Sequence, residues 1–403
     1  MQLNRIHTVI IGAGVQGTAL ALKLLDAKDT NFVMLDPQPV MAEWFRNTSN
    51  QRLNLLRTPH TANLEPSGDA TMLPARSKID PSSPASVELF NRFHARLISS
   101  NQLETYRKAA QVKSIIPAGN EFIVEAIINK QSVHYLTRNV VCAVGLGKPW
   151  MPDICVNVPS IVHAHYVNLL NPPYSYSDGR VAIVGSGLTA TTLANYYAGR
   201  YIGVDLFCRS ALSVQQLETV PEWRPGQRLH DGFLDTRKMT ERVRQLKAAR
   251  ATNVVTPDAW DNLVVNINAG RVTLHSQGAI ESVDVDSRGN GKIGDKVFEK
   301  IIFATGYKID ATQMPMLRDV IDPNTDVANG LPILNDDCSH HRLKNLFFMG
   351  KLAELTVGPL GRNIPGALYA SKQIAQRILN DTLPVVPAGR PSKLGVEAYQ
   401  LSF

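Results

Sequence analysis

The sequence predicts an α/β fold with two units in which a buried strand, a glycine turn and a helix follow one another, the second unit being inserted in the first. Three observations support this prediction. Residues 9–17 and 181–190 each run from an apolar stretch into closely spaced glycines. In both copies a second apolar stretch ends 24 residues after the first glycine of the turn. After the second copy, residues 345–350 again form an apolar run that ends in glycine and residues 366–379 predict a helix, which indicates a return to the first unit.

The first signature contains Gly12, Gly14 and Gly17, and the apolar run that follows it ends at Asp36. Glycines in this turn let the backbone approach a pyrophosphate, and the N-terminus of the following helix attracts that anion. A carboxylate at the end of the second strand accepts hydrogen bonds from a free ribose diol. The first unit is therefore predicted to bind FAD. A plain turn role for Asp36, which precedes a proline, remains the alternative.

The second signature contains Gly185, Gly187 and Ala190, and the position of the acid is taken by Arg209. Because an arginine suits a ribose 2′-phosphate, the second unit is predicted to bind NADPH. A solvated strand end is the alternative for Arg209. The fold class that follows is α/β, with two Rossmann-like dinucleotide-binding domains (FAD and NADPH), the second inserted in the first.

Several elements are predicted between the two signatures. A long polar excursion that contains prolines occupies residues 37–84, and an amphipathic helix follows over residues 86–98. Residues 112–116 and 122–128 alternate in the manner of an antiparallel meander. The meander leads into a buried strand over residues 139–145.

The boundaries of the second unit follow from composition. Residues 171–179 are rich in turn formers and predict a linker. A polar helix is expected near residues 236–250, with strands at 262–267 and 272–275 and a closing strand at 301–307. The predicted domains are 1–176 for the first part of the FAD-binding domain, 177–304 for the NADPH-binding domain, 305–385 for the return of the FAD-binding domain and 386–403 for a C-terminal tail.

The composition is typical of an enzyme with two or three domains, since 44% of the 403 residues are hydrophobic. No apolar stretch approaches the roughly 20 residues of a membrane helix. The first strand begins within a few residues of Met1, so we expect a cytoplasmic protein without a signal peptide or a membrane span. The formal net charge is +7, but Lys and Arg are dispersed along the chain, so we expect no nucleic-acid partner.

The cysteines and histidines predict no metal site. Four cysteines are scattered without a CxxC pair, which argues against a disulfide scaffold, a zinc site and a redox-active dithiol. We expect inert, buried thiols at these positions. His163 and His165 have no third ligand nearby, so a loop role is favoured over metal binding. The cysteines are Cys142, Cys155, Cys208 and Cys338.

Nearly the whole chain resembles the flavoproteins with two dinucleotide-binding domains, and within them the class B flavin monooxygenases and the N-hydroxylating lysine and ornithine monooxygenases. The resemblance rests on the paired signatures, on Gly145 at a strand end before a proline, and on the Ala-Thr-Gly-Tyr sequence of residues 304–307. The chain looks like a divergent branch. The Phe and Gly of the monooxygenase fingerprint are absent before residues 163–165, and Gly350 and Lys351 replace the Gly-Asp pair that many flavoproteins use at the ribityl chain.

The resemblance implies an NADPH-dependent FAD monooxygenase. In that mechanism NADPH gives hydride to FAD, the reduced flavin adds dioxygen to form a C4a-hydroperoxide, and a nitrogen, sulfur or carbonyl centre of a small molecule is oxygenated. Two other functions remain open: an NADPH-dependent flavin reductase or oxidase that uses no disulfide, and a non-catalytic flavin or nucleotide sensor that binds a partner protein. The expected partners are the small-molecule substrate and dioxygen, and a homo-oligomer is left open.

The resemblance also implies site residues. Asn54, Arg57 and His60 are the catalytic candidates, since in the family the segment after the first ribose acid passes the isoalloxazine and would face flavin N5 or the nicotinamide; a structural loop is the alternative. Residues 358–366 match the place where the family sets the flavin pyrimidine at a helix N-terminus, or form a plain glycine-proline loop. The predicted cofactor-binding residues are Gly12, Gly14, Gly17, Asp36, Trp44, Val112, Gly145, Gly350, Asn363, Gly366, Gly185, Gly187, Thr189, Ala190, Arg209, Thr305 and Gly306.

Overall fold

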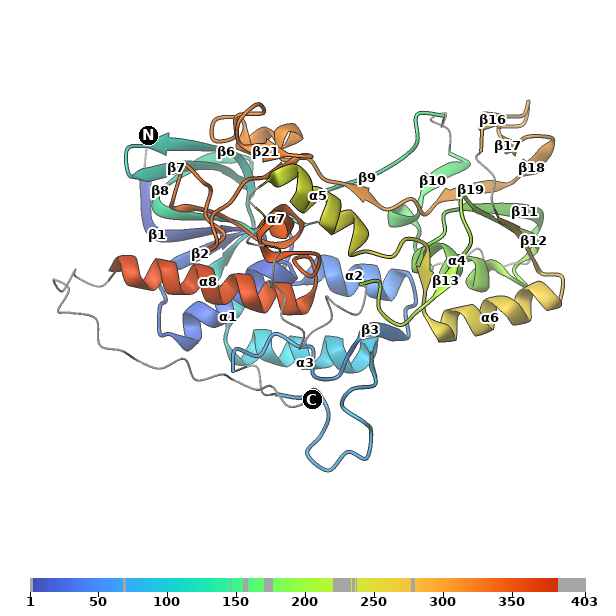
Figure 1. The fold of residues 1–403 in the computed structure, drawn as a ribbon, viewed down its shortest axis with the longest axis horizontal. Helices are drawn as coiled ribbons and strands as arrows, with labels where there is room; N and C mark the ends of the chain where they lie inside the picture. The colour runs from blue at the N-terminus through green and yellow to red at the C-terminus, as the bar shows by residue number, and fades with distance from the viewer. Residues whose placement is uncertain are drawn as a thin grey trace.

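The computed structural model describes residues 3–67, 70–145, 147–154, 159–169, 177–219, 233, 236, 238–276 and 280–382. Two α/β units lie side by side, each with a sheet at its centre (Figure 1). The predicted α/β class with two such units is therefore confirmed. Cys155, residues 171–176 of the predicted linker and the predicted tail at 386–403 lie outside the described residues.

The first sheet has the strand order β5-β2-β1-β8-β7-β6, and β23 pairs with β8 beside this path. Strands β1, β2, β5, β8 and β23 run parallel, whereas β6, β7 and β8 form the predicted antiparallel meander. Helices α1 (Val15–Asp26) and α8 (Ile364–Thr382) pack against each other beside the sheet (Figure 1). The strands are Leu3–Ile11 (β1), Phe32–Leu35 (β2), Arg107–Lys108 (β5), Gln111–Ala118 (β6), Glu121–Ile128 (β7), Gln131–Cys142 (β8) and Leu346–Phe348 (β23).

The apolar run before the first glycine turn explains why β1 lies at the centre of this sheet. Val9 and Ile10 are 0% exposed, and the strand is covered on both faces, as the continuous apolar pattern of a parallel strand requires. Strand β2 on one side is buried throughout, and β8 on the other is buried over its last four residues. The carboxyl ends of β1, β8 and β23 consequently meet at one edge of the sheet.

The second sheet is parallel throughout, in the order β10-β19-β11-β12-β15. In sequence its strands lie between β8 and β23 of the first sheet. Residues 177–179, which were assigned to the linker, begin β11 instead because Ser177 pairs with Tyr201 on β12. Strand β10 precedes the predicted boundary at residue 177, and the domain limits stay a prediction. The strands are Ile161–His163 (β10), Ser177–Val184 (β11), Tyr201–Cys208 (β12), Val272–Ser276 (β15) and Lys300–Phe303 (β19).

One predicted strand of the second unit is wrong. Residues 262–267 lie in helix α6 (Pro257–Asn268), which packs on α4 (Leu188–Tyr197). The helix begins with a proline in its first turn, and Ala259 and Leu263 recur at a spacing of four on its buried face. Val265, which made the segment resemble a strand, is 61% exposed. The helical period over the longer segment therefore outweighs the short apolar run.

The polar excursion after β2 is partly regular. It contains α2 (Ala42–Asn50) and β3 (Leu55–Pro59), and β3 pairs with β4 (Pro84–Ser86). The predicted amphipathic helix is α3 (Val87–Ser100). Its N-cap, Ser86, accepts a hydrogen bond of 3.2 Å from the Leu89 amide, as is typical of a serine at this position.

A segment of the second unit crosses over to the first. Helix α5 (Met239–Ala248), which lies within the predicted polar helix, packs on α7 (Glu354–Val357) of the first unit (Figure 1). Leu246 of α5 belongs to the first unit's core and is 8% exposed. Arg242 Nη1 donates a hydrogen bond of 3.0 Å to the Leu355 carbonyl. Helix α5 therefore joins the two units.

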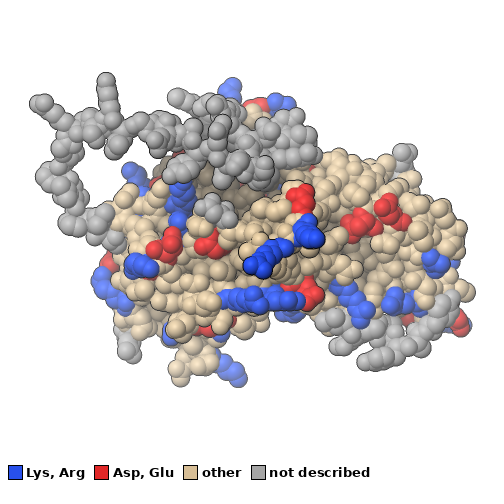
Figure 2. Space-filling view, turned by 90° about the horizontal axis from the view of Figure 1, so that it is seen from below, with Lys and Arg blue, Asp and Glu red and all other residues tan. Residues whose placement is uncertain are grey.

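Short strand pairs complete the fold. No described helix combines the length and the apolar character that a bilayer span requires. On the face shown in Figure 2, basic and acidic side chains are interspersed over the surface. The short strands are Lys148–Pro149 (β9) with Tyr307–Lys308 (β20), Ser213–Val214 (β13) with Val254–Val255 (β14), Asp284–Val285 (β16) with Gly291–Ile293 (β17) and Lys296–Phe298 (β18), and Val327–Ala328 (β21) with Leu331–Pro332 (β22).

The described cysteines are buried, free thiols, as predicted. Burial raises the pKa of Cys142, raises that of Cys208 to about 11 and raises that of Cys338 to about 12. The thiolate is the reactive form of cysteine, so these three thiols are inert at neutral pH.

Candidate functional site

A cavity of about 820 Å³ opens at the carboxyl edge of the second sheet. Its floor is the turn between β11 and α4, and its sides are the ends of β12 and β19. This is the point where the strand order reverses, and ligands of parallel α/β sheets bind there. Six of the predicted cofactor-binding residues line the cavity: Gly185, Gly187, Thr189, Arg209, Thr305 and Gly306.

Gly185 and Gly187 are required in this turn for different structural reasons. Gly185 has a φ of +150°, and a Cβ there would lie 2.5 Å from the Ala304 carbonyl oxygen, so close strand packing excludes a side chain. At Gly187 no atom lies within 4 Å of the place of a Cβ, which leaves the backbone open toward the cavity. Ala190, the third signature position, is 0% exposed and packs in the core. The turn can thus receive a pyrophosphate at Gly187 and the N-terminus of α4.

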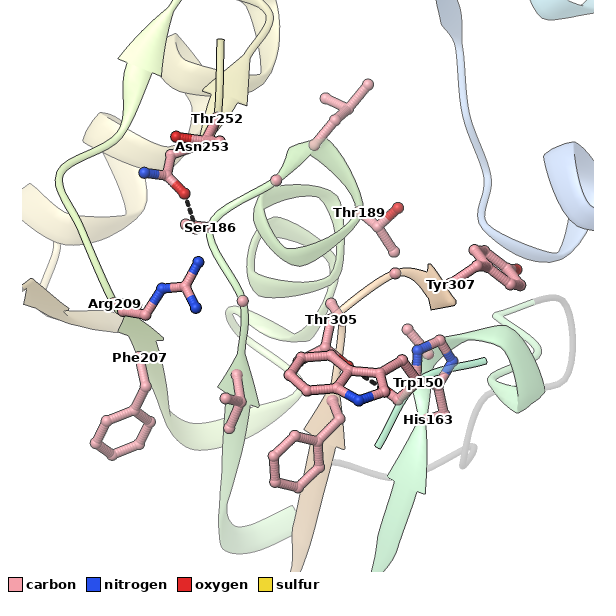
Figure 3. Close-up of a pocket in the computed structure, with 18 of the residues that line it drawn as sticks. Trp150, His163, Ser186, Thr189, Phe207, Arg209, Thr252, Asn253, Thr305 and Tyr307 are labelled. Atoms are coloured by element: carbon pink, nitrogen blue, oxygen red, sulfur yellow. Dashed lines mark hydrogen bonds between the residues drawn. The ribbon is translucent and has the colours of Figure 1, made fainter. Parts of the chain in front are cut away.

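Arg209 marks one end of the cavity (Figure 3). The side chain is exposed and makes no hydrogen bond or ion pair to any residue that the structure describes. Close to it, Asn253 accepts a hydrogen bond from the Ser186 hydroxyl and donates one of 2.7 Å to Ser210 Oγ. A free guanidinium beside hydroxyl and amide groups suits a phosphate ester.

Aromatic rings gather at the opposite end, where Trp150, His163 and Tyr307 lie (Figure 3). The Thr305 hydroxyl donates a hydrogen bond to the Trp150 carbonyl. His163 is 3% exposed, and its Nδ1 accepts a hydrogen bond of 3.0 Å from the His165 amide. No described residue satisfies a hydrogen bond to its Nε2 in full geometry; burial lowers the pKa of the ring, and the nearby Gly306 backbone opposes this shift. The neutral ring therefore carries its proton on Nε2.

Arg57 brings the first unit into the wall of the cavity. Its Nη2 donates a hydrogen bond of 2.7 Å to the Val254 carbonyl, and its Nη1 donates one of 3.4 Å to the Gln216 carbonyl. The Gln216 side chain in turn donates 3.1 Å to the Arg57 carbonyl. Burial lowers the pKa of Arg57, while Glu218, which also lines the cavity, opposes this shift. The cavity thus spans both units.

Asn54 and His60, the other two catalytic candidates, lie away from this cavity. Asn54 is exposed, and its carbonyl accepts a hydrogen bond of 2.9 Å from the Val87 amide. His60 is 5% exposed, and its Nδ1 lies 2.9 Å from the Ser83 carbonyl oxygen. The first contact joins the two ends of the β3–β4 pair, and the second lies in the loop between these strands. Contact of either residue with a flavin stays a prediction.

The first glycine turn repeats the geometry of the second. Gly12 has a φ of +104°, and a Cβ there would lie 2.6 Å from the carbonyl oxygen of Ala143, which directly follows β8. A Cβ at Gly17 would lie 2.0 Å from the Gly12 carbonyl oxygen. At Gly14, by contrast, no atom lies within 4 Å of the place of a Cβ. The central glycine is again the one with an open face, and the residues present fit a pyrophosphate.

The Asp36 side chain stabilises the first glycine turn through hydrogen bonds to backbone amides. Its Oδ2 accepts a hydrogen bond of 2.8 Å from the Ala13 amide, and its Oδ1 accepts one of 2.8 Å from the Gln38 amide. Each carboxylate oxygen has a second lone pair, so the side chain can organise the turn and still accept from a ribose diol. The turn role and the ligand role are therefore compatible.

The remaining predicted residues lie around the first unit. Gly145 has no atom within 4 Å of the place of a Cβ, whereas a Cβ at Gly366, in the first turn of α8, would lie 2.2 Å from the Leu360 carbonyl oxygen. Asn363 directly precedes α8, and its carbonyl accepts from the Ala367 amide at 2.9 Å. Trp44 Nε1 donates 3.0 Å to Asn91 Oδ1, and Val112 packs against the core from β6.

One group of side chains has the composition of a metal site: Asp326, His340 and His341. The Arg342 guanidinium already neutralises Asp326. His340 Nδ1 accepts from the Arg342 and Leu343 amides at 3.3 and 3.2 Å, so the neutral ring carries its proton on Nε2, the nitrogen that faces Asp326 at 3.5 Å. A protonated nitrogen cannot bind a metal ion. The group is a buried charge network.

The sequence did not indicate several cavity residues. Ser186 lies within the signature, at a position for which the pattern predicts no role, and no local pattern marks Trp150, His163 or Asn253 as a lining residue. Asn253 has a φ of +60°, a backbone state that asparagine tolerates better than most residues, yet an asparagine alone does not reveal it.

Comparisons with known proteins agree with this geometry. A family model described as pyridine nucleotide-disulphide oxidoreductase matches residues 9–221, which contain both glycine turns. No curated protein matches the chain in sequence.

Solved structures share the fold. The cadaverine monooxygenase DfoA from Erwinia amylovora, bound to FAD, is 17% identical, with a TM-score of 0.69 over 99% of this chain and 100% of that chain. The ornithine hydroxylase PvdA from Pseudomonas aeruginosa is 17% identical, with a TM-score of 0.67 over 93% and 99%. The bacillithiol disulfide reductase Bdr from Bacillus cereus is 13% identical, with a TM-score of 0.64 over 94% and 100%.

Proposed function

The chain belongs to the pyridine nucleotide-disulphide oxidoreductase family, and from this premise we propose that it is an NADPH-dependent FAD monooxygenase that oxygenates a nitrogen, sulfur or carbonyl centre of a small molecule. One observation carries the proposal: each of the two sheets has a glycine turn at the carboxyl end of a central parallel strand, with an open central glycine. An acid follows the first turn and a free arginine the second, at the same spacing. A cytoplasmic location and dioxygen as co-substrate belong to the same proposal.

The residues divide the two cofactors between the units. Gly14 and the N-terminus of α1 would receive the FAD pyrophosphate, and Asp36 the adenosine ribose. Gly187 would receive the NADPH pyrophosphate, and Arg209 the 2′-phosphate. The flavin, when bound, supplies hydride acceptance and the reduction of dioxygen. The nicotinamide would then lie at the end of the cavity toward His163, on the side of β19 and β10.

The aromatic end of the cavity supports a monooxygenase. Trp150 and Tyr307 provide apolar surface, and His163 Nε2 offers a single donor from a buried position. Trp150 is 41% exposed, so this end would exclude water, as an oxygenating flavin enzyme requires, once the two cofactors cover it. The three described cysteines are buried thiols with raised pKa values, so none of them suits a redox-active disulfide. This argues against a reductase that works through a disulfide formed by these residues.

A second candidate is an NADPH-dependent flavin reductase or oxidase. The likeness to a bacillithiol disulfide reductase favours it, since that protein shares the fold over nearly the whole chain. A reductase needs the same two cofactors and the same hydride transfer. Only the fate of the electrons on the reduced flavin separates the two functions.

Stopped-flow spectroscopy tests the proposal. Protein reconstituted with FAD is reduced by NADPH without oxygen and is then mixed with oxygenated buffer. We expect a transient that absorbs between oxidised and reduced flavin, and its lifetime should shorten when dithionite replaces NADPH so that no NADP⁺ is present. A panel of amines, sulfides and ketones is then screened for oxygenated products.

The other outcomes are distinct. Stoichiometric hydrogen peroxide without any transient, for every substrate, would replace the proposal by the reductase or oxidase. Failure of NADPH to reduce the bound flavin would indicate a sensor. The Arg288→Ala variant is a control that should behave as the wild type in these measurements. Arg288 lies exposed in the turn between β16 and β17, away from the cavity.

A further inference from the structure

His165 connects Tyr307 to the first unit at the aromatic end of the cavity (Figure 3). Both residues line the cavity, and His165 Nδ1 lies 2.9 Å from the Tyr307 hydroxyl oxygen. The other ring nitrogen of His165, Nε2, lies 3.9 Å from Glu43 Oε1 on α2. These side chains therefore form a series of polar groups that runs from the cavity wall to a helix of the first unit.

The Glu43 carboxylate is fixed in place by its own helix. Its Oε1, the atom that faces His165, accepts a hydrogen bond of 3.0 Å from Asn47 Nδ2. Its Oε2 is paired with the Arg46 guanidinium. The Glu43 side chain is 46% exposed, so this end of the series is in contact with solvent.

Aromatic rings shield the opposite end of the series, at Tyr307. The rings of His163 and His165 pack edge-on against the Tyr307 ring, with centroids at 5.9 and 5.7 Å. The His165 side chain is only 19% exposed. The series thus leads from solvent, through a mostly buried imidazole, to the wall of the cavity.

The neighbours of Tyr307 make its hydroxyl a weak acid. Burial raises the pKa of Tyr307, the Glu43 charge and Tyr166 raise it further, and Arg46 lowers it. The hydroxyl is consequently protonated at neutral pH. It can release a proton into the cavity only when another proton replaces it, and His165 is within hydrogen-bond distance to supply one.

The proposed reaction consumes one proton from solvent. NADPH, dioxygen, the substrate and this proton give NADP⁺, the oxygenated substrate and water. Without a substrate the same proton is consumed, because dioxygen then leaves as hydrogen peroxide. Hydride transfer from NADPH needs no solvent proton, so the proton is required only when dioxygen reacts. The cofactors would cover the aromatic end of the cavity at that stage, which leaves the protein's own groups to conduct the proton.

We propose that Glu43, His165 and Tyr307 conduct this proton from solvent into the cavity, an inference that rests on the proposed function. In the tautomer whose Nδ1 proton is donated to the Tyr307 oxygen, the tyrosine passes its hydroxyl proton into the cavity and takes the Nδ1 proton in its place. His165 Nε2 then takes a proton from solvent. Rotation of the new hydroxyl proton toward the cavity and a tautomer change of His165 restore the starting state.

Glu43 acts on this path through its charge. The separation of 3.9 Å from His165 Nε2 is too long for a direct hydrogen bond, but a carboxylate at that distance attracts an incoming proton. Tyr307 is therefore the proton donor to the cavity, and His165 and Glu43 are positioning residues that act through it.

The test compares His165→Ala, Tyr307→Phe and Glu43→Gln with the control Glu88→Gln. Glu88 is matched to Glu43, because it lies exposed in the first turn of α3 and pairs with an arginine of the same helix, Arg92. Stopped-flow absorbance measures two rates separately: the reduction of the bound flavin by NADPH, and its return to the oxidised state after mixing with oxygenated buffer.

We expect the rate of reduction to stay as in the wild type in all variants. The return should slow by about 100-fold in His165→Ala, the lower end of what a positioned proton donor contributes, and added imidazole should restore most of this rate. Tyr307→Phe should slow the return without restoration by imidazole. Glu43→Gln should slow it less, because it removes a charge and leaves the path in place, and Glu88→Gln should leave it unchanged.

A second measurement uses the protein without cofactors. NMR spectra of isotope-labelled tyrosine follow the titration of Tyr307, whose signal is identified by its loss in Tyr307→Phe. Because the Glu43 charge raises the pKa of Tyr307, Glu43→Gln should lower this pKa. Glu88→Gln should leave it unchanged.

Equal slowing of both rates in His165→Ala, or slowing that imidazole does not relieve, would show that His165 only supports the structure, and would overturn the proposal. An unchanged pKa of Tyr307 in Glu43→Gln would overturn it as well. If the wild type binds no FAD, or NADPH does not reduce the bound flavin, the proposed function fails and this inference fails with it. Wild-type rates in all three variants would instead leave the proposed function standing and overturn the proton path alone.

Discussion

Arg57 of the first unit donates a hydrogen bond of 2.7 Å to the Val254 carbonyl of the second unit. Val254 follows directly on Asn253, which bonds to Ser186 in the glycine turn. The Arg57 contact therefore fixes the first unit against the segment that flanks the predicted 2′-phosphate end of the cavity. A second connection, from α5 to α7, is made by the same part of the chain. The segment from α5 to β14 thus touches both predicted cofactor sites.

Replacement of Arg57 by alanine should impair both stability and cofactor binding. It leaves the Val254 carbonyl without its donor, and a lost hydrogen bond from a charged group costs about 1–3 kcal/mol. We expect a lower thermal midpoint and a Michaelis constant for NADPH that rises by about tenfold, equivalent to roughly 1.4 kcal/mol. The exposed Arg92→Ala on α3 serves as the control, because its ion pair with Glu88 is at the surface. Equal effects in both variants would contradict the role assigned to Arg57.

Asp36→Ala should weaken FAD binding by about 1–3 kcal/mol, since the ribose acceptor is lost. The same change also removes the acceptor of the Ala13 and Gln38 amides, so part of the loss arises from the turn. Asp36→Asn separates the two effects, because an amide oxygen can still accept from one of these amides while the charge is gone. FAD affinity is measured by flavin fluorescence on desalted, reconstituted protein. Flavin retention by the alanine variant equal to that of the wild type would count against FAD in the first unit.

Arg209→Ala should reduce the preference for NADPH over NADH. The guanidinium is exposed and makes no hydrogen bond or ion pair within the described part of the chain, so its removal should not disturb the fold. We expect a loss of about 1–2 kcal/mol toward NADPH, at the lower end for a charge-assisted contact in a solvated site. The Michaelis constants of both nucleotides are compared in wild type, Arg209→Ala and the control Arg288→Ala. Unchanged discrimination in the first variant would refute the 2′-phosphate assignment but not the dinucleotide fold.

The parts of the fold that could be predicted from the sequence are those with a local cause. Gly12 and Gly185 have positive φ angles, which favour glycine, and the strand–turn–helix order around them follows from the pattern of consecutive residues. The aromatic end of the cavity has no such cause, because Trp150, His163 and Tyr307 come from three separate segments that meet only in the folded chain. The incorrect prediction of a strand at residues 262–267 also arises from information that is not local. A short apolar run does not distinguish a strand from a helix, because it does not show which residues the folded chain buries.

The buried carboxylate of Asp205 predicts an acid-sensitive second unit. Asp205 is 0% exposed and accepts hydrogen bonds from His275 Nε2 at 2.6 Å, Lys296 Nζ at 2.9 Å and Arg180 Nε at 2.9 Å. Burial alone would raise its pKa, but the hydrogen bonds from Lys296, His275 and Arg180 outweigh burial and lower it. Because the folded pKa is below the unfolded value of about 3.9, the stabilisation is complete above that value and is lost as the pH falls through the folded pKa.

Asp205→Asn should therefore destabilise the protein by about 1–3 kcal/mol at neutral pH, a moderate cost because Arg180 and Lys296 are partly exposed and can be solvated when they lose the charge. Urea denaturation of wild type and variant is followed between pH 7 and pH 3. The gap between their midpoints should be constant down to about pH 5 and should narrow below about pH 4, as the wild-type carboxylate becomes protonated. Asp284→Asn, at an exposed position on β16, should show no gap at any pH. A gap of unchanged size at pH 3 would mean that the geometry of the aspartate, rather than its charge, supports the second sheet.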